Sequence, residues 1–213
     1  MSRKIAVIDY GMGNLRSVSK AIEHVAGDAE VRVTDDPAWI RAAERVVFPG
    51  QGAARDCMAA IGEHHLDEAV LEAARSKPFL GICMGLQVLM EFSEENGGTP
   101  LLGLFPGRVK RFDGTAMGDN GLPLKIPHMG WSPVDQRREH PLWQGIPDGG
   151  RFYFVHSYRV VPEDPSLVVA TTDYGVRFTS AIARDNLFAC QFHPEKSADN
   201  GLRLLKNFVE WKP

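Results

Sequence analysis

The sequence lacks the features that mark membrane, secreted and zinc-binding proteins. It has no apolar run approaching the roughly 18–20 residues that cross a bilayer, and its first apolar stretch, residues 5–8, ends at Asp9, which is too short for a secretory signal peptide. The chain has three cysteines, Cys57, Cys83 and Cys190, and no Cys-x-x-Cys pair. This set argues against a disulfide framework and a structural zinc site. We therefore expect a cytoplasmic protein with no membrane partner, no metal and no cofactor.

A surplus of one charge sign is also absent. The 24 lysine and arginine residues nearly balance the 27 aspartate and glutamate residues, and the formal net charge is −3. Proteins built to bind DNA or RNA carry clustered positive charge, so nucleic acid is not an expected partner. Hydrophobic residues at 44% and charged residues at 24% are typical of a globular protein. We expect residues 1–213 to form one domain.

The pattern of apolar runs predicts an α/β fold. In the first half, strands alternate with helical patterns; the strands are expected at 4–8, 30–34, 45–48 and 78–82, and the helices at 15–26, 61–75 and 86–92. This alternation is typical of a doubly wound, mostly parallel sheet with helices on both faces. The second half predicts a mixed or antiparallel extension, with strands at 104–111, 151–160, 167–172, 179–183 and 187–191 before an amphipathic helix around 202–209.

One cysteine lies in a motif that suits a nucleophile. Cys83 is the centre of Gly81-Ile-Cys-Met-Gly85, directly after an apolar strand and before a helical pattern. This is the cysteine form of the G-x-S-x-G elbow, in which a strand turns sharply into a helix and holds the nucleophile at the corner. The alternative is a buried apolar cysteine that happens to be flanked by glycines.

A thiol nucleophile needs a base and a group that orients the base. The segment His193-Pro-Glu195 follows an apolar strand and supplies an imidazole and a carboxylate on a stiff turn. Acyl transfer also needs donors for a developing oxyanion, and Pro49-Gly-Gln-Gly52, at the end of another buried strand, has the glycines to aim backbone N–H groups at one. Taken singly, a surface His-Pro turn and an ordinary strand-to-helix turn also explain these two segments.

Together, the three motifs resemble the class I, or triad, glutamine amidotransferase family. They stand in the family's order and spacing, and the resemblance covers essentially the whole chain. Four segments are also similar to the glutaminase subunits of imidazole glycerol phosphate synthase: residues 8–15 (IDYGMGNL), 127–131 (PHMGW), 153–158 (YFVHSY) and 191–197 (QFHPEKS).

The resemblance implies a glutaminase that works through a thioester. Cys83 would attack the side-chain amide of glutamine, His193 would move the protons, and Glu195 would hold the imidazole. The oxyanion would be bound by backbone groups of Gly50, Gln51, Gly52 and Met84. Gln51 departs from the family pattern, in which valine is usual at this position.

The resemblance also implies substrate and partner contacts. Six residues would lie against glutamine: Gln87, Glu95, His156, Ser157, Tyr158 and Ser197. Trp131 and Lys196 would face a separate (β/α)8 cyclase subunit in a heterodimer. There, ammonia joins a ribotide to give imidazole glycerol phosphate and aminoimidazole carboxamide ribotide in histidine biosynthesis. Without the resemblance, each of these side chains has an ordinary alternative as a core, helix-edge or solvated residue.

Three other functions stay open at this point. A cysteine peptidase would use the same thiol, imidazole and carboxylate, but it would cut peptides without a partner. A different glutaminase subunit, for pyridoxal phosphate or anthranilate synthesis, would differ in the synthase it serves. A thiol-sensing or regulatory protein on the same fold would lack catalysis, although Gln87 and the complete set of Cys83, His193 and Glu195 argue against it.

Overall fold

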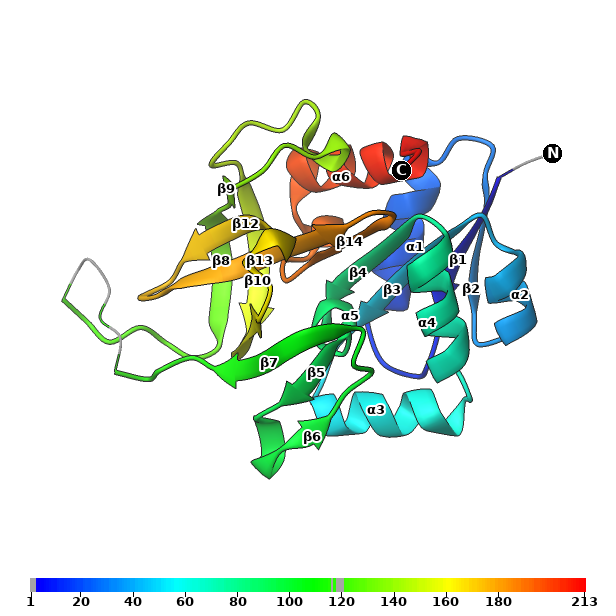
Figure 1. The fold of residues 1–213 in the computed structure, drawn as a ribbon. Helices are drawn as coiled ribbons and strands as arrows, with labels where there is room; N and C mark the ends of the chain where they lie inside the picture. Colours follow the sequence, from blue (N-terminus) through cyan, green and yellow to red (C-terminus); the bar gives the residue numbers. More distant parts are fainter. Residues whose placement is uncertain (1–2, 116, 118–120) are drawn as a thin grey trace.

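A computed structural model describes residues 3–115, 117 and 121–213, and a central sheet with helices on both faces organises them (Figure 1). The first half of the chain alternates strands and helices as predicted. Its elements are β1 (Lys4–Ile8), α1 (Leu15–Val25), β2 (Glu30–Thr34), α2 (Pro37–Ala42), β3 (Arg45–Gly50), α3 (Ala54–Glu63), α4 (Asp67–Ser76) and β4 (Phe79–Cys83).

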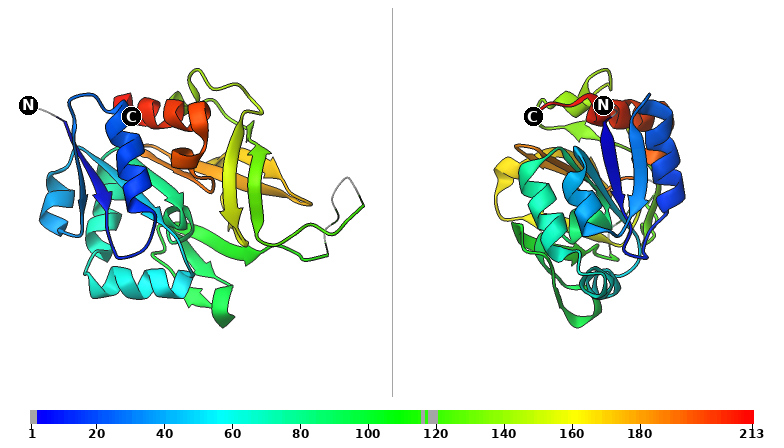
Figure 2. Two further views of the ribbon diagram at one scale, coloured as in Figure 1. Left: turned by 180° about the vertical axis from the view of Figure 1, so that it is seen from behind. Right: turned by 90° about the vertical axis from the view of Figure 1, so that its right-hand side faces the viewer.

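Five parallel strands form the core of the sheet, in the order β2-β1-β3-β4-β14, where β14 spans Leu187–Cys190. Every residue of β3, β4 and β14 is buried, as expected for parallel strands that are covered on both faces. Helices α1 and α6 (Ala198–Glu210) cover one face, and α2, α3 and α4 cover the other (Figure 2). The predicted doubly wound, mostly parallel sheet is confirmed.

The second half of the chain extends this sheet with mostly antiparallel pairs, and one parallel pair, β5 with β7, makes the extension mixed, as predicted. From β14 the order continues β13-β11-β7-β5-β6, with β12 and β9 joined at β13. A separate two-stranded ladder pairs β8 with β10. These elements are β5 (Met90–Ser93), β6 (Thr99–Pro100), β7 (Phe105–Arg111), β8 (His128–Pro133), β9 (Asp135–Gln136), β10 (Arg151–His156), β11 (Tyr158–Pro162), β12 (Val168–Asp173) and β13 (Arg177–Arg184).

Three of the predicted elements are wrong in detail. The helix at 61–75 is two helices, α3 and α4, because His65 takes a left-handed conformation with φ of 53° between them. The helix at 86–92 is a single turn, α5 (Met84–Gln87), followed by strand β5, since a short apolar run fits a buried strand as well as a helix. The strand at 151–160 divides at Ser157 into β10 and β11, which belong to different sheets.

The parallel strands bring three predicted motifs to one edge of the sheet. Gly50 at the end of β3 pairs in register with Cys83 at the end of β4, and Cys190 at the end of β14 pairs with Ile82. Carboxyl ends of neighbouring parallel strands form the usual ligand-binding crevice of such sheets. No helix in the described ranges is long and apolar enough to cross a membrane.

The turn after β4 is possible only because the backbones of β3, β4 and α5 approach very closely. A Cβ atom on Gly85 would overlap the carbonyl oxygen of Phe48. A Cβ atom on Gly81 would lie 2.8 Å from the Gly85 carbonyl oxygen and 2.9 Å from the Ala189 Cβ atom. Both flanking glycines of the elbow are therefore required by contact distance, because backbone atoms cannot move aside as a flexible side chain can.

We expect Gly85→Ala to lower the free energy of unfolding by about 3 kcal/mol or more, because the added methyl group overpacks a backbone contact. Chemical denaturation monitored by circular dichroism measures this loss. Gly62→Ala is the matched control, since a Cβ atom on Gly62 in α3 meets nothing within 4 Å, and alanine in a helix gains about 0.5–1 kcal/mol over glycine. Equal stability of the two variants would contradict the close approach.

Candidate functional site

Cys83 occupies the strained corner that its motif predicts. Its φ and ψ are 56° and −106°, a left-handed φ that a non-glycine residue adopts rarely and at a cost in energy. The residue ends β4 and immediately precedes α5, and its side chain, 5% exposed, lines a pocket. The strand, the turn and the glycines thus fix one sulfur atom at the carboxyl edge of the sheet.

The helix after the elbow is shorter than predicted. Helix α5 has only the four residues Met84–Gln87, so few aligned peptide dipoles point at the sulfur and the helix contributes little positive charge there. Stabilisation of a thiolate at Cys83 therefore depends on individual side chains and backbone groups around it.

His193 and Glu195 form a buried pair on the turn after β14. His193 Nδ1 lies 2.8 Å from Glu195 Oε1, and the two side chains are 3% and 1% exposed. Because the carboxylate accepts, Nδ1 carries the proton, which leaves Nε2 as the nitrogen that can exchange a proton with a reacting group. Among the described residues Nε2 is buried without a hydrogen-bond partner, and the ring lines the same pocket as Cys83.

The protonated form of His193 is favoured strongly. Burial lowers its pKa, but Cys83 and Glu195 favour the imidazolium and outweigh burial, raising the pKa of His193 to about 10. The His193 ring thus lies between a thiol group and a carboxyl group, both of which favour its protonated form. Thiol, imidazole and carboxylate in this order are the groups that nucleophilic acyl transfer uses.

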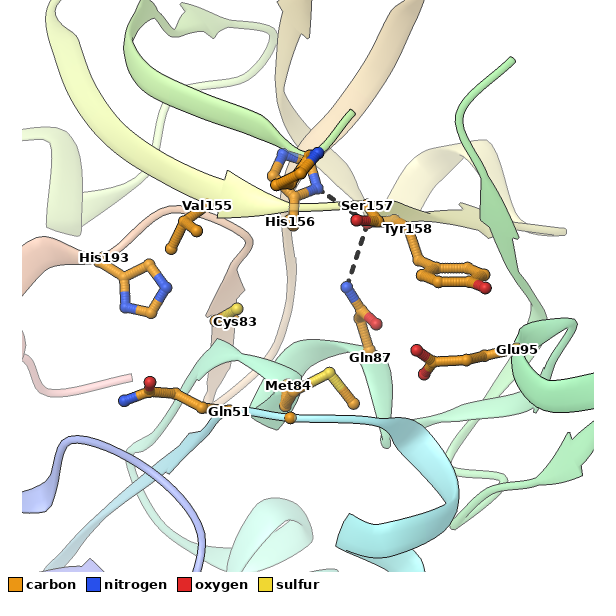
Figure 3. A pocket seen from close by; sticks show the side chains of 12 residues that line it. Gln51, Cys83, Met84, Gln87, Glu95, Val155, His156, Ser157, Tyr158 and His193 are labelled. Atoms are coloured by element: carbon orange, nitrogen blue, oxygen red, sulfur yellow. Dashed lines mark hydrogen bonds between the residues drawn. The ribbon is translucent and has the colours of Figure 1, made fainter. Parts of the chain in front are cut away.

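The pocket in front of the sulfur has a volume of about 290 Å³, close to the lower limit for small-molecule sites. Figure 3 shows the side chains around it, with Cys83 near the centre and His193 beside it. Its lining comes from the turns after β3 and β4, the segment joining β10 to β11, and single residues from elsewhere: Gln51, Gly52, Cys83, Met84, Gln87, Glu95, Pro127, Val155, His156, Ser157, Tyr158 and His193.

Gln87 is held at the pocket by two acceptors. Its Nε2 donates to the Tyr158 carbonyl oxygen at 3.1 Å and to Gln191 Oε1 at 3.0 Å. Both N–H groups are thereby used inside the protein, so Oε1 is the atom that Gln87 can offer to a ligand. Figure 3 shows this oxygen on the side that faces Glu95.

Two histidines form a buried hydrogen-bonded pair above the pocket. His156 Nδ1 lies 2.8 Å from the Tyr158 carbonyl oxygen, and His156 Nε2 lies 3.0 Å from His128 Nδ1. His128 Nε2 in turn lies 2.8 Å from the Ser132 hydroxyl. Burial lowers the pKa of His156 to about 3 and that of His128 to about 4. Both rings are therefore neutral, and His156 has no free ring nitrogen for a ligand.

The segment predicted to bind an oxyanion is held from behind. A Cβ atom on Gly50 would overlap the Tyr10 hydroxyl, so only glycine fits there. The Cys57 thiol donates to the Gln51 carbonyl oxygen at 3.3 Å, which fixes the direction of the peptide between Gln51 and Gly52. Gly52 has a φ of 96°, a conformation that favours glycine.

Two of the residues predicted to contact substrate form hydrogen bonds within the protein; one of them lies outside the pocket lining and the other lines the pocket. Ser197 was predicted to touch substrate, but its side chain is outside the pocket lining: its hydroxyl donates to the His193 carbonyl oxygen at 2.6 Å and accepts from the Tyr153 N–H at 3.0 Å. Glu95 does line the pocket, and its Oε2 accepts from the Ala54 N–H at 2.7 Å, at the start of α3.

The two residues predicted to face a partner lie together beside the His193 turn. Trp131 on β8 is 46% exposed, and its ring packs edge-on against Tyr153 with centroids 6.2 Å apart. The Lys196 ammonium lies 6.0 Å from the centre of the same Tyr153 ring. Exposed Met129, on the same strand as Trp131, adds to an apolar surface.

Sequence reasoning missed two polar residues of the site, Gln191 and His128. Gln191 is fully buried, and its Nε2 lies 3.6 Å from Cys83 Sγ. A glutamine placed between the apolar strand Leu-Phe-Ala-Cys and Phe192 is the sequence signal for it, since a buried amide needs partners. His128 gave no such signal, because its partner His156 is 28 residues away and is reached only through the β8–β10 ladder.

Comparisons of the sequence and of the fold with known proteins agree with one another. The sequence model of the family described as "Glutamine amidotransferase class-I" matches residues 6–211. The protein named imidazole glycerol phosphate synthase subunit HisH from Aromatoleum aromaticum is 61% identical, covering 98% of this chain and 99% of the relative. Its namesake from Dechloromonas aromatica is 63% identical, covering 98% and 97%. The solved structure of PurLQS from Thermotoga maritima has a TM-score of 0.73 at 18% identity, covering 99% of each chain, which supports the fold.

The buried histidine pair predicts a loss of stability in acid. Because folding lowers both pKa values below the ordinary value of about 6.5, the unfolded state binds more protons, and stability falls as pH drops from about 6.5 toward 4. His140, whose pKa burial lowers to about 4, adds a slope of the same sign. His193 has a raised pKa and adds an opposing slope near pH 6.5, where the unfolded state loses its proton but the folded state does not. Each proton contributes up to about 1.4 kcal/mol per pH unit.

Denaturant unfolding between pH 7 and 4.5 measures this slope. We expect His128→Gln to reduce it, since the variant keeps a side chain that can hydrogen-bond but cannot titrate. The same substitution at exposed His24 controls for the loss of a histidine. An unchanged slope in His128→Gln would show that the pair does not set the acid sensitivity.

Proposed function

Since the chain belongs to the class-I glutamine amidotransferases, and within them to the family of HisH subunits of imidazole glycerol phosphate synthase, we propose that it hydrolyses glutamine to glutamate and ammonia for a separate cyclase subunit. The observation that carries this proposal is that Cys83 and His193 line one small pocket, while Glu195 lies against His193 Nδ1. The remaining residues named below have supporting roles.

The reaction proceeds in two halves. The Cys83 thiolate attacks the carbonyl carbon of the glutamine side-chain amide, and the protonated His193 gives its proton to the departing nitrogen, so that ammonia leaves and a γ-glutamyl thioester remains. The neutral imidazole then takes a proton from water, whose oxygen attacks the thioester. Glutamate leaves, and the thiolate and the imidazolium of His193 are restored.

Backbone groups stabilise the negative oxygen that forms in both halves. The N–H of Met84, directly after the nucleophile, is one donor, and the peptide groups of Gly50, Gln51 and Gly52 supply another. One lost donor of this kind costs roughly 100- to 1,000-fold in rate. The contact of Cys57 with the Gln51 carbonyl oxygen gives this segment one defined orientation, and a docked partner that changes it changes the rate.

The far end of the pocket holds the amino-acid part of the substrate. Gln87 Oε1 accepts from a substrate N–H group, and the Glu95 carboxylate attracts the α-ammonium group. Ser157 and Tyr158 close the wall opposite them. His156 holds this wall in place and offers no ring nitrogen to the substrate, because both of its nitrogens are hydrogen-bonded within the protein.

The acceptor for ammonia is a (β/α)8 cyclase subunit, in a heterodimer. It uses the ammonia to make imidazole glycerol phosphate and aminoimidazole carboxamide ribotide on the route to histidine. Trp131 and Lys196 lie on the docking surface, where a large aromatic side chain is a typical anchor. The chain forms one glutaminase domain over residues 1–213 and works in the cytoplasm.

The first test is activity with the partner. Purified chain, cyclase subunit, glutamine and ribotide together should yield imidazole glycerol phosphate, with glutamate release far faster than from the chain alone. Cys83→Ser should lower glutamate release roughly 1,000-fold or more, since it removes the nucleophile but little volume. Cys190→Ser, the same change at a buried thiol outside the pocket, is the control. Peptide cleavage without the cyclase would support the peptidase instead.

A second test addresses Glu195. Glu195→Gln should slow glutamine hydrolysis at least about tenfold, and less than Cys83→Ser does, because a neutral amide stabilises the imidazolium less than a carboxylate does. It should also move the alkaline limb of the pH–rate profile to lower pH, since Glu195 helps to raise the pKa of His193. Exposed Glu210→Gln is the control for charge. A profile equal to the parent's from pH 6 to 9 would remove Glu195 from the triad.

A further inference from the structure

Gln191 is a buried polar residue that the reaction as described does not use. It follows β14 directly, two residues before His193, and is fully buried. One end of its side chain, Oε1, lies 3.0 Å from Gln87 Nε2, and the other end, Nε2, lies 3.6 Å from Cys83 Sγ. It therefore connects a pocket residue to the nucleophile through the interior of the protein.

One backbone carbonyl group sets the direction of the three hydrogen bonds that link Tyr158, Gln87, Gln191 and Cys83. The Tyr158 carbonyl oxygen can only accept, so the end of Gln87 that lies 3.1 Å from it must be the NH₂ group. The same NH₂ group donates to Gln191, so the Gln191 atom that accepts must be its side-chain oxygen. The NH₂ group of Gln191 is then left to point at the sulfur of Cys83.

Building on the proposed glutaminase function, we propose that Gln191 is a positioning residue for the nucleophile, whose side-chain N–H donates to Cys83 Sγ and favours the thiolate. A thiolate accepts hydrogen bonds and a thiol both donates and accepts, so a donor locked in this direction stabilises the charged form more. The orientation of the amide is set before any substrate arrives, because both of its partners are part of the fold.

The surroundings make such a donor important. Helix α5 has one turn and supplies little dipole charge. His193 gives up its proton to the leaving nitrogen during the reaction, so its charge is lost in the middle of the cycle. The Gln191 amide cannot be deprotonated, and it remains beside the sulfur when the thioester breaks and the sulfur becomes negative again.

Alkylation of Cys83 by iodoacetamide tests the contact without any substrate or partner. The rate at Cys83, followed by peptide mass spectrometry from pH 5 to 10, reports the thiolate directly. Gln191→Met keeps the length of the side chain but loses the donor. We expect its pH–rate profile to move to higher pH and its rate at neutral pH to fall about tenfold, as for loss of a hydrogen bond to a charged group. Ser180→Ala is the matched control: Ser180 is fully buried, its backbone carbonyl pairs with the Gln191 N–H, and its hydroxyl has no partner in the described residues.

A second variant keeps the inference testable if Gln191→Met folds poorly. Gln191→Glu can still accept from Gln87, but it presents an oxygen to the sulfur. We expect its alkylation profile to move to higher pH at least as far as that of Gln191→Met. In both variants kcat for glutamine should fall more than KM rises, because the donor acts on the reacting sulfur. A wild-type alkylation profile in either folded variant would overturn the role of Gln191.

The two proposals can fail separately. If the variants shift the alkylation profile while even the unmodified chain releases no glutamate in the presence of the cyclase, the proposed function fails and the contact stands. If glutamate release is normal and partner-dependent but alkylation is unchanged by Gln191→Met, the function stands and the inference about Gln191 fails.

Discussion

The close packing of the elbow against its two neighbouring strands is the constraint on which the site depends. The sulfur of Cys83 reaches the pocket because β4 turns within one residue, and that turn exists because Gly81 and Gly85 let backbones meet at contact distance. The same packing brings Gly50 on one side and β14 on the other into register with the end of β4. The strain at Cys83 is maintained by the buried strands around it, as expected for strained positions at functional sites.

A second organising element is the carbonyl group of Tyr158. It accepts from Gln87 and lies at hydrogen-bond distance from the ring of His156, as Figure 3 shows. Because a carbonyl oxygen cannot donate, it sets the orientation of two side-chain amides on one side and the tautomers of two histidines on the other. One backbone group thus determines the direction of hydrogen bonds from Ser132 to Cys83.

The sequence allowed the parallel half of the sheet to be predicted well, because apolar strands such as those at 4–8 and 30–34 are short, continuous and bounded by turns. Motif spacing also indicated the elbow and the His193 turn. The end of α5 was not predictable, since an apolar run does not reveal where a helix gives way to a strand. The break at His65 lies between two helices, α3 and α4, and no glycine or proline stands between them to mark it. The partners of Gln191 and His128 depend on strand order, which local patterns do not contain.

The β8–β10 ladder joins the exterior of the molecule to His193 by a very short path. Trp131 on β8 stands in register opposite Tyr153 on β10. The Tyr153 carbonyl oxygen accepts from the His193 N–H at 2.9 Å, and its N–H donates to the Ser197 hydroxyl, which in turn donates to the His193 carbonyl oxygen. The backbone of His193 is therefore hydrogen-bonded to β10, whose partner strand β8 carries the exposed Trp131. We therefore expect a body that binds at Trp131 to act on the position of His193 through Tyr153.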